Sequence, residues 1–572
     1  MRVRQEALGH SPHWRRSMSR SHRRSSPDNS RQMAVLLVLL LSMVGGLDAV
    51  SLRPSAFLKL PDKIGSLRFG VGSASHAAFD EERSILYVVG TYGGVLNVVD
   101  MADPDNPVLA QTIGFDAVID GYPDSIAYCK RNYIEHLAIS FVRTNTPSPA
   151  SVRFFKPLTS PTDEVVRLYS VPVNGFDPTD LAWSNDCSRL VVVSQGRVHR
   201  LNGVFDDPTG DVEVIQPRPG NTADRILIPI TSEKLAAAGA RQVFSRCSSG
   251  SELVSDRRQD YEPRSVTIDA NNVAYIASSK NNVLGGLNLE AAQYELQFAP
   301  QLLKSWRNQG IDTSSQDGGI NLQSYPINTF YQSAALASFT MNGETFLASA
   351  DTGEFTRYSI ADVGCDFEES ATGYDWLYTI NNAFAGSMSS SDQSILREAL
   401  GNPAKLAQMR FTNLKTAADG YSLTQEGYSH LTGYGGRGMS VLRVSTQTRV
   451  YDSGDLFERV FTEASTPSVY RELFNARLEG GNSKPTDSVD QMSPETGPRP
   501  SAIAVGRVDD DTLLLVVSNG NVGGLYTSRW TRGTRCPTQC SKASSGEATR
   551  GSAGTRPTGA TTTRLEKRTY KL

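Results

Sequence analysis

The chain has 572 residues, of which 39% are apolar and 20% are charged; this composition supplies a large folded core and excludes a globally disordered protein. The net charge of −3 is unevenly distributed: residues 1–32 carry eight arginines against two acids, residues 529–572 carry ten basic residues against two acids, and the body between them has a charge of −17. An acidic body repels phosphates, so nucleic acid is excluded as its partner.

The first predicted element is a targeting segment. Residues 34–44 (AVLLVLLLSMV) form an uncharged apolar run that follows arginine-rich sequence and precedes the small residues Gly45, Gly46 and Ala49. This order is typical of a secretory signal peptide, and the run is shorter than the roughly 20 residues of a membrane span. We therefore expect residues 1–49 to be a basic leader and signal peptide of a secreted protein. An uncleaved, single-pass signal anchor is the alternative, and only in that case do we expect a membrane as partner.

The body has the pattern of a strand repeat. Runs rich in β-branched and aliphatic residues, bounded by Gly, Asn, Asp or Ser, occur at 85–90, 95–100, 189–194, 273–278, 345–350, 440–444 and 512–518. A shorter motif precedes most of these runs: ASHAAF (74–79), PDSIAY (123–128), PTDLAW (178–183), PRSVTI (263–268), SAALAS (333–338), YSHLTG (428–433) and PSAIAV (500–505). Proline lacks an N–H and suits a strand entry, and a small residue allows neighbouring sheets to approach near an axis. The seven copies predict an all-β, seven-bladed β-propeller-like fold, with a β-sandwich as the alternative.

The copies are 49 to 95 residues apart, which is longer than compact blades require and indicates insertions. We expect helices at 232–244 and from Ser391 or Asp392 to Gly401, and a loop at 461–499. After Trp530 the sequence is rich in Gly, Ser, Thr and Arg, so residues 55–528 are the predicted propeller domain and 529–572 a basic disordered tail. The polar C-terminus offers no hydrophobic tail for a lipid anchor.

Four stretches carry a family resemblance: GIDTSSQDGGINL (310–322), NGETFLASADTGEFTRY (342–358), YGGRGMSVLRV (434–444) and VYDSGDLFERVFT (450–462). They resemble the choice-of-anchor I domain family, which includes mesenchyme-specific cell-surface glycoproteins of biomineralising invertebrates. The resemblance covers roughly residues 55–528. It implies an extracellular propeller-like domain, acting in animals on or around mineral-forming cells; some bacterial relatives are labelled phosphatase-like.

The chain departs from the family pattern at several acidic positions. It reads ADTGE at 350–354 where the family has Ala-Asn-Glu-Gly-Asp, and VSQGR at 193–197 contains no carboxylate. PRPS at 498–501 replaces Pro-Glu-Pro-Glu, and NGNVGG at 519–524 replaces Glu-Arg-x-Gly-Gly. If those acids bind metal or act as acid–base groups in relatives, this chain has lost much of the set. The tail after Tyr526 also departs from the family, and residues 58–60 are an alternative source for the last closing strand.

Four cysteines lie in the body, at 129, 187, 247 and 365, without a CxxC pair or a histidine at zinc-ligand spacing. In an oxidising compartment they allow up to two disulfides, in three possible pairings. Cys536 and Cys540 lie in the tail, where they form a local loop or stay free. The chain contains no Asn-x-Ser/Thr sequence, so we expect no N-glycosylation.

The candidate metal ligands are acidic residues near strand ends. Glycine-rich loops contain Asp312, Asp317, Asp351 and Glu354. Asp124 is the second residue of its six-residue repeat motif, PDSIAY. Calcium binds six to eight oxygen ligands, several of them carboxylates on short loops, so calcium is the expected cofactor. The alternative is that these acids are solvated turn residues, as we expect for Asp100, Asp103 and Asp105. A shared cavity containing Asp124, Asp351 and Asp312 would favour the metal hypothesis.

The motif copies do not predict a symmetric ring of ligands. The second residue of the motif is a carboxylate in one copy and an arginine in one other. Across the seven copies it is Ser75, Asp124, Thr179, Arg264, Ala334, Ser429 and Ser501. His76 and His430 follow this place in two copies. Either they meet Asp124 near the axis, or they are histidines hydrogen-bonded at strand entries, which we favour.

Enzyme signatures are poor. GYGGRG (433–438) precedes a strand-like run rather than a helix, which argues against a dinucleotide site. No nucleophile elbow, HExxH or Walker A sequence occurs. The acids Asp452, Asp455 and Glu458 fit a turn better than a catalytic group. We therefore predict a secreted, acidic binding or matrix protein associated with calcium or biomineral deposition at the cell surface. Its expected partners are cations and an extracellular matrix or mineral surface. The alternative is a divergent metal-dependent phosphatase-like hydrolase.

Overall fold

The computed structural model describes residues 37–44, 49–67, 72–142, 150–197, 199–201, 204–243, 257–360, 365–378, 384–464, 466, 468–477, 488–521, 524–531 and 568–569. Of the predicted leader and signal peptide (1–49), residues 1–36 and 45–48 lie outside these residues, as do residues 532–567 and 570–572 of the predicted tail, Cys247, Cys536 and Cys540. Antiparallel strands dominate this part of the chain, and no helix in it is long and apolar enough to span a membrane.

Six four-stranded antiparallel sheets form the body of the described chain. The first sheet consists of β3 (His76–Asp80), β4 (Ile85–Gly90), β5 (Val95–Asp100) and β6 (Val108–Gly114). The second consists of β7 (Tyr122–Arg131), β8 (Ile134–Val142), β9 (Ser151–Phe155) and β10 (Arg167–Pro172). The third consists of β11 (Pro178–Trp183), β12 (Leu190–Ser194), β15 (Asp211–Arg218) and β16 (Thr222–Leu227). The fourth sheet consists of β17 (Ser265–Ile268), β18 (Val273–Ser278), β19 (Val283–Asn288) and β20 (Leu296–Pro300). The fifth consists of β23 (Ser333–Met341), β24 (Glu344–Asp351), β32 (Gly438–Arg443) and β33 (Thr448–Asp452). The sixth consists of β34 (Pro500–Asp509), β35 (Thr512–Asn519), β36 (Gly524–Thr531) and β37 (Arg568–Thr569).

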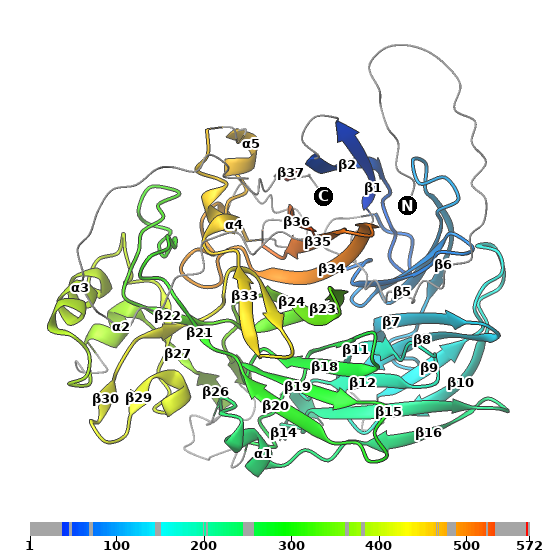
Figure 1. Ribbon diagram of the computed structural model, residues 1–572, viewed down its shortest axis with the longest axis horizontal. Helices are drawn as coiled ribbons and strands as arrows, with labels where there is room; N and C mark the ends of the chain where they lie inside the picture. Colours follow the sequence, from blue (N-terminus) through cyan, green and yellow to red (C-terminus); the bar gives the residue numbers. More distant parts are fainter. Residues whose placement is uncertain are drawn as a thin grey trace.

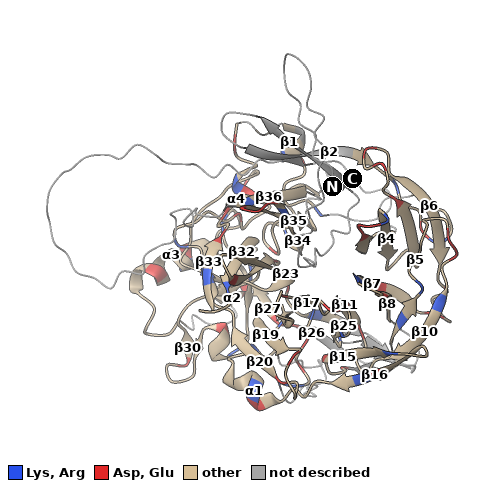
Figure 2. Cartoon of the chain, turned by 45° about the vertical axis from the view of Figure 1, so that its right-hand side comes forward, with Lys and Arg blue, Asp and Glu red and all other residues tan. Residues whose placement is uncertain are grey.

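The sheets are arranged around a common axis, with the first strand of each sheet innermost (Figures 1 and 2). Each inner strand contacts the inner strand of the next sheet in the order β3, β7, β11, β17, β23 and β34. Within a sheet the register is that of consecutive hairpins; for example, Ala182 on β11 lies opposite Val191 on β12. The all-β, propeller-like prediction is therefore confirmed.

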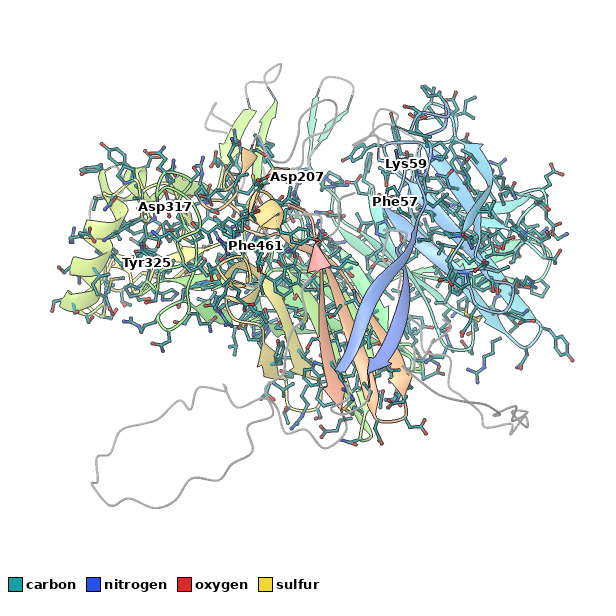
Figure 3. The ribbon with its side chains drawn as sticks, turned by 90° about the horizontal axis from the view of Figure 1, so that it is seen from above. Phe57, Lys59, Asp207, Asp317, Tyr325 and Phe461 are labelled. Atoms are coloured by element: carbon teal, nitrogen blue, oxygen red, sulfur yellow. A yellow bond between two sulfur atoms is a disulfide. The ribbon has the colours of Figure 1, made fainter. Side chains whose placement is uncertain are left out.

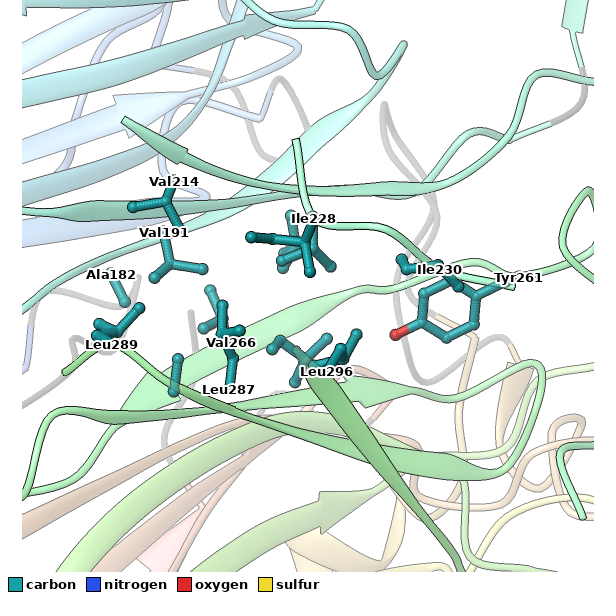
Figure 4. Packing of buried hydrophobic residues seen from close by; sticks show 14 of the residues in the cluster. Ala182, Val191, Val214, Ile228, Ile230, Tyr261, Val266, Leu287, Leu289 and Leu296 are labelled. Carbon is teal, nitrogen blue, oxygen red and sulfur yellow. The ribbon is translucent and has the colours of Figure 1, made fainter. Parts of the chain in front are cut away.

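The hydrophobic cores lie between adjacent sheets. One cluster joins Val191 and Val214 of the third sheet to Val266 and Leu287 of the fourth, and Tyr261 closes one end of it (Figure 4). Because each central strand faces a neighbouring sheet on both sides, β12 is buried along its whole length. This two-sided burial explains why residues 190–193 (LVVV) are continuously apolar instead of alternating apolar and polar.

The seventh motif copy does not form an inner strand of a four-stranded sheet. Six motif copies form the inner strands, but YSHLTG (428–433) forms the short strands β30 (Gly427–Tyr428) and β31 (Thr432–Gly433). The apolar run that follows it, in β32, pairs with β24 as the third strand of the fifth sheet. Tyr428 and Leu431 are buried against Trp306 and Trp376, so the same local pattern here serves the core of an insertion.

That insertion contains a five-stranded sheet in the order β21 (Leu303–Ser305), β22 (Asn328–Phe330), β31, β28 (Arg410–Thr412) and β27 (Ser370–Thr372). Helices α2 (Gly373–Tyr378) and α3 (Ser390–Leu400) pack nearby at one end of the molecule (Figure 1). Ser389 caps α3 by accepting a hydrogen bond from the Asp392 N–H, so the cap precedes the two predicted positions by two or three residues. The other predicted helix is shorter than expected: α1 spans Ser232–Ala237.

Smaller elements complete the described chain. Two-stranded sheets pair β13 (His199–Leu201) with β14 (Val204–Asp206), β25 (Arg357–Ile360) with β26 (Cys365–Glu368), and β29 (Tyr421–Ser422) with β30. The remaining helices are the 3-10 helix η2 (Ala417–Asp419), α4 (Leu456–Arg459) and α5 (Ser468–Arg471), the last of which lies inside the predicted 461–499 loop.

Strand β1 (Leu37–Val44), from the apolar run, pairs with β2 (Ala49–Phe57). The fourth strand of the sixth sheet is β37, from the C-terminal region, and not residues 58–60, which form no strand. Strand β36 continues to Thr531, three residues beyond the predicted end of the domain.

Candidate metal site

Three carboxylates from two distant segments of the chain converge beside the inserted sheet. Asp312 and Asp317 lie in the loop between β21 and β22, and Asp490 lies in the segment that leads to β34. One oxygen of each carboxylate lies within 4.8 Å of the others. Asp312 and Asp490 are buried, whereas Asp317 is half-buried and is placed at the inserted end of the molecule (Figure 3). Within the described residues, this is the group that could hold a metal ion through at least three side chains.

The local backbone fixes the two loop carboxylates. Asp312 Oδ2 accepts a hydrogen bond from the Asn321 N–H at 2.8 Å, and Asp317 Oδ1 accepts one from the Gly319 N–H at 3.3 Å. The loop is closed by backbone hydrogen bonds between Ile311 and Gln323 in both directions. The carboxylates are therefore oriented by the turn and keep oxygen lone pairs for a ligand.

The three carboxylates raise one another's pKa values or have them raised by burial, and Arg437 offsets this only in part, at Asp490. Burial, together with the charges of Glu458 and Asp490, raises the pKa of Asp312 to about 9. Burial and neighbouring carboxylates raise the pKa of Asp490 to about 7, and burial raises that of Asp317. In the described chain no Lys or Arg forms an ion pair with any of the three. A bound cation would supply the missing positive charge.

A buried polar layer lies behind the carboxylates. Arg437 Nη1 donates to the Asp312 carbonyl oxygen at 2.7 Å and to Glu458 Oε1 at 3.0 Å, and Arg437 Nη2 donates to the Ser493 carbonyl oxygen at 2.7 Å. Asn475 Nδ2 donates to Glu458 Oε1 at 3.0 Å and to Ser493 Oγ at 2.8 Å. The Ser493 hydroxyl in turn donates to Asp490 Oδ1. This layer connects all the segments that form the site, and its arginine is paired with Glu458 rather than with the three carboxylates.

The donor set fits a hard cation bound by oxygen. Calcium takes six to eight oxygen ligands in a flexible geometry, and three carboxylates supply up to six oxygens, with water or backbone carbonyls completing the shell. No cysteine or histidine belongs to the group, which argues against zinc. Asp312, Asp317 and Asp490 would hold the ion, and calcium is the ion that this donor set favours.

The other predicted ligands lie elsewhere. Asp351, at the end of β24, is buried and accepts a hydrogen bond from Ser349 Oγ at 2.5 Å. Asp124, on β7, accepts one from Thr91 Oγ1 at 2.9 Å. Glu354 forms an ion pair with Arg264. Asp124, Asp351 and Asp312 therefore have separate partners and do not form the shared group that we considered.

The propeller axis has a mixed charge. Burial raises the pKa of the Glu354 carboxyl, but the nearby charges of Arg264, Arg499 and Arg197 outweigh it. The pKa therefore lies below its ordinary value. Arg197 also lies beside Asp177, with Nε 3.6 Å from Oδ2. Of these residues, Arg197, Glu354 and Arg499 stand in stretches where the chain departs from the family pattern.

The two histidines do not meet. His76 Nδ1 lies 2.7 Å from the backbone oxygen of Asp124, whereas His430 Nδ1 lies 3.1 Å from Ser429 Oγ in the insertion. Burial lowers the pKa of His430. The strand-entry interpretation therefore describes His76, and His430 belongs to a different sheet system.

The remaining acidic candidates lie in turns. Asp100 and Asp103 accept hydrogen bonds from the N–H groups of Ala102 and Asp105, as predicted for a turn after a strand. Asp452 ends β33 and accepts a hydrogen bond from Gly454 N at 2.8 Å. The turn leads into α4, on which Glu458 lies behind the metal site.

One disulfide joins Cys129 and Cys187 and connects the second sheet to the turn after β11. It selects one of the pairings that the sequence left open. Cys365 begins β26, and its side chain is not described.

The sheet topology defines a β-propeller-like domain, and a choice-of-anchor I domain model matches residues 75–531. The chain belongs to the choice-of-anchor I domain family. Asp312, Arg437 and Glu458 each fall in a different one of the family-like stretches, so three of the four stretches meet at the candidate metal site.

Two curated relatives match parts of the chain. It is 24% identical over 276 residues to the mesenchyme-specific cell surface glycoprotein of Strongylocentrotus purpuratus, covering 45% of this chain and 34% of the relative. It is 39% identical over 99 residues to Gigasin-3a of Magallana gigas, covering 16% of this chain and 33% of the relative. The matched part spans about a third of the length of each relative.

Similarity to solved structures is low. A protein from Lactobacillus plantarum aligns with 57% of this chain and 75% of its own, at 11% identity and a TM-score of 0.30. The β-propeller domain of Cps50 (Swd1) from Myceliophteria thermophila aligns with 48% of this chain and 68% of its own, at 11% identity and a TM-score of 0.24. The fold assignment rests on the strand topology described above.

Proposed function

We propose that this protein is an extracellular binding protein whose propeller-like domain holds calcium at Asp312, Asp317 and Asp490. The observation that carries the proposal is the convergence of three carboxylates whose oxygens lie within 4.8 Å of one another without an arginine or lysine partner in the described chain. A divalent cation relieves their mutual repulsion, and calcium accepts this all-oxygen donor set. Extracellular calcium near millimolar concentration is sufficient to occupy a site of moderate affinity.

The extracellular location is supported by independent features. The Cys129–Cys187 disulfide is a bond that persists in oxidising compartments. A curated relative is named a cell surface glycoprotein. The −17 charge of the body adds a diffuse attraction for cations around the specific site. We propose a matrix or mineral surface as the partner, with the bound calcium bridging this acidic surface to it.

Calorimetric titration of the purified full chain with calcium tests the proposal. We expect saturable binding of one ion in the wild type and at least about a tenfold loss of affinity in Asp312→Asn and Asp490→Asn, because each variant removes one anionic ligand. Glu81→Gln is the matched control, since this acid is exposed and lies outside the site. The absence of saturable heat at millimolar calcium would contradict the proposal.

The phosphatase-like alternative requires turnover. The same preparation is therefore assayed against a phosphomonoester with calcium, magnesium or zinc supplied. Metal-dependent hydrolysis that is lost in Asp490→Asn would favour the hydrolase over a protein that only binds. We expect no such turnover, because the sequence contains no nucleophile elbow, HExxH or Walker A motif.

A further inference from the structure

Three arginines from three different sheets surround one carboxylate at the propeller axis. Arg264 directly precedes β17, Arg499 directly precedes β34, and Arg197 follows β12. Arg264 forms an ion pair with Glu354, and the charges of the other two arginines act on the same carboxyl group. We call Arg197, Arg264 and Arg499 the axial arginines. They come from distant parts of the sequence and converge on one place.

The strand registers place these residues at the same end of their sheets. Each inner strand begins opposite the end of the second strand of its sheet. Pro178 lies opposite Ser194 in the third sheet, and Pro500 lies opposite Asn519 in the sixth. The axial arginines, and the glutamate after β24, are each only a few residues from such an end. They therefore lie on the face of the propeller at which the inner strands begin.

The backbone of Glu354 is fixed by its neighbours. The fully buried Gln332 donates from Nε2 to the Glu354 carbonyl oxygen and accepts a hydrogen bond from Glu354 N at 3.1 Å. Gly353 packs so closely against Thr496 that a Cβ added to this glycine would lie 3.2 Å from the Thr496 Cα. This packing brings the Glu354 loop against the segment that leads to Arg499.

Arg499 has a strained backbone. Its φ is 52°, in the left-handed region that favours glycine, and it lies between Pro498 and Pro500. Its carbonyl oxygen accepts a hydrogen bond from Gly520 N at 2.8 Å, which holds this conformation. The Arg499 side chain is exposed and forms no ion pair with the residues that the structure describes. Backbone strain of this kind is concentrated at functional sites, because elsewhere a less strained residue would serve.

Arg197 is anchored by an acid that lies beneath it. Arg197 N donates to Asp177 Oδ2 at 3.0 Å, and Arg197 Nε lies 3.6 Å from the same oxygen. The arginine side chain is 54% exposed and that of Asp177 is 12% exposed, so the guanidinium extends toward solvent above the carboxylate. The charges of Asp124, Glu262 and Glu354 also act on Arg197. Acids of several sheets therefore hold this arginine near the axis.

We propose that the axial arginines bind a small ligand through a tetrahedral oxyanion, which is a phosphate or sulfate group. A guanidinium presents its N–H donors as a planar fork that matches such oxygens. Asp177 balances the charge of Arg197, and Glu354 balances that of Arg264. An added anion would therefore pair with Arg499 and share outer N–H groups of the other two arginines.

The shape and charge of the surroundings limit the class of ligand. Three guanidinium forks from three directions suit an anion with several oxygens in three dimensions better than a planar carboxylate. The −17 charge of the body repels a long polyanion, which would have to lie along the acidic surface. A small molecule with one phosphate or sulfate group avoids that repulsion.

Calorimetric titration of the full chain with inorganic phosphate, in EDTA and at low ionic strength, tests this inference. We expect saturable binding by the wild type and about a tenfold loss of affinity in Arg499→Gln, because this variant removes one charge-assisted donor. Arg499→Lys keeps the charge without the fork and should retain part of the affinity. The matched control is Arg218→Gln, since Arg218 is an exposed arginine paired with Asp224 on the third sheet.

Glu354→Gln should change the affinity in the opposite direction. The variant removes a negative charge that repels the ligand, and it releases donors of Arg264, so phosphate should bind more tightly. The hydrogen bonds from Gln332 go to the Glu354 backbone and remain in the variant. Sulfate should bind about as well as phosphate, whereas acetate should bind more weakly.

Several outcomes would overturn the inference. They are no saturable binding of phosphate or sulfate by the wild type, unchanged affinity in Arg499→Gln, an equal loss in Arg218→Gln, weaker binding in Glu354→Gln, and acetate binding as tight as that of phosphate. Thermal transitions check the folding of each variant. EDTA removes calcium, and none of the axial arginines belongs to the metal site, so failure here leaves the calcium proposal unaffected.

Discussion

Arg437 and Glu458 form an ion pair in which both side chains are almost completely buried, with Nη1 and Oε1 3.0 Å apart. Arg437 precedes β32 of the fifth sheet and Glu458 lies on α4, so the pair fixes the helix to the sheet. The same arginine holds the Asp312 and Ser493 carbonyl oxygens. Arg437 therefore determines where the Asp312 loop and the segment around Ser493 meet behind the metal site.

Removing this arginine should destabilise the fold. In Arg437→Met the Glu458 carboxylate and two buried carbonyl groups lose their donor, and we expect the free energy of unfolding to fall by about 3–5 kcal/mol. Chemical denaturation measures the change. Arg218→Met is the control, because Arg218 and Asp224 form an exposed pair that should contribute no more than about 1 kcal/mol. Similar losses in both variants would contradict the role assigned to burial.

The Ser493 hydroxyl should tune calcium binding without maintaining the fold. It donates to Asp490 Oδ1 and accepts from Asn475 Nδ2, so Ser493→Ala removes the group that orients Asp490. We expect calcium affinity to fall by about tenfold, as for other residues that support metal ligands. Calorimetry measures the affinity, and Ser493→Thr, which keeps a hydroxyl, should restore part of it. Unchanged affinity in the alanine variant would remove Ser493 from the site.

Asp351 should make stability depend on pH. Burial raises its pKa from 3.8 to about 6, against the opposing effects of Arg449 and neighbouring hydroxyls. The unfolded chain therefore loses this proton first, and the contribution of Asp351 to stability declines as pH rises from 3.8 to about 6. Asp351→Asn should raise the free energy of unfolding by on the order of 1–3 kcal/mol near pH 7 and have little effect near pH 4.

Denaturation at the two pH values, with Glu81→Gln as the control, provides the measurement for Asp351. A variant that is less stable than the wild type near pH 7 would show that the attraction of Arg449, and not burial, dominates at this position.

The Cys129–Cys187 disulfide should stabilise the junction of the second and third sheets. It closes a loop with a sequence separation of 58 residues, for which loop-closure entropy gives an upper value of about 4 kcal/mol. We expect Cys129→Ser with Cys187→Ser to lower the free energy of unfolding by about 2–4 kcal/mol. Thermal and chemical denaturation without reductant check this value. Equal stability of the wild type and the double variant would show that sheet packing alone holds the junction.

The sequence by itself determined the repeat and its strand entries. Six motif copies form inner strands because a proline or a small residue at a strand entry is a local requirement, independent of the partner strand. It also determined the acidic body and placed Asp312 and Asp317 together, since residues five apart in a glycine-rich loop remain close after folding. The cysteine count limited the disulfide to a few pairings.

Only the tertiary structure decided which strands pair and which acids meet. The copy at 428–433 has the local pattern of an inner strand, but β32 after it pairs with β24 across a long insertion, and local sequence does not specify that partner. Asp490 joins Asp312 for the same reason: no motif marks it, and its segment reaches the site through packing around Arg437 and Asn475. Strand entry is decided by neighbours in sequence, whereas the ligand set and the number of sheets depend on contacts between segments that are distant in the chain.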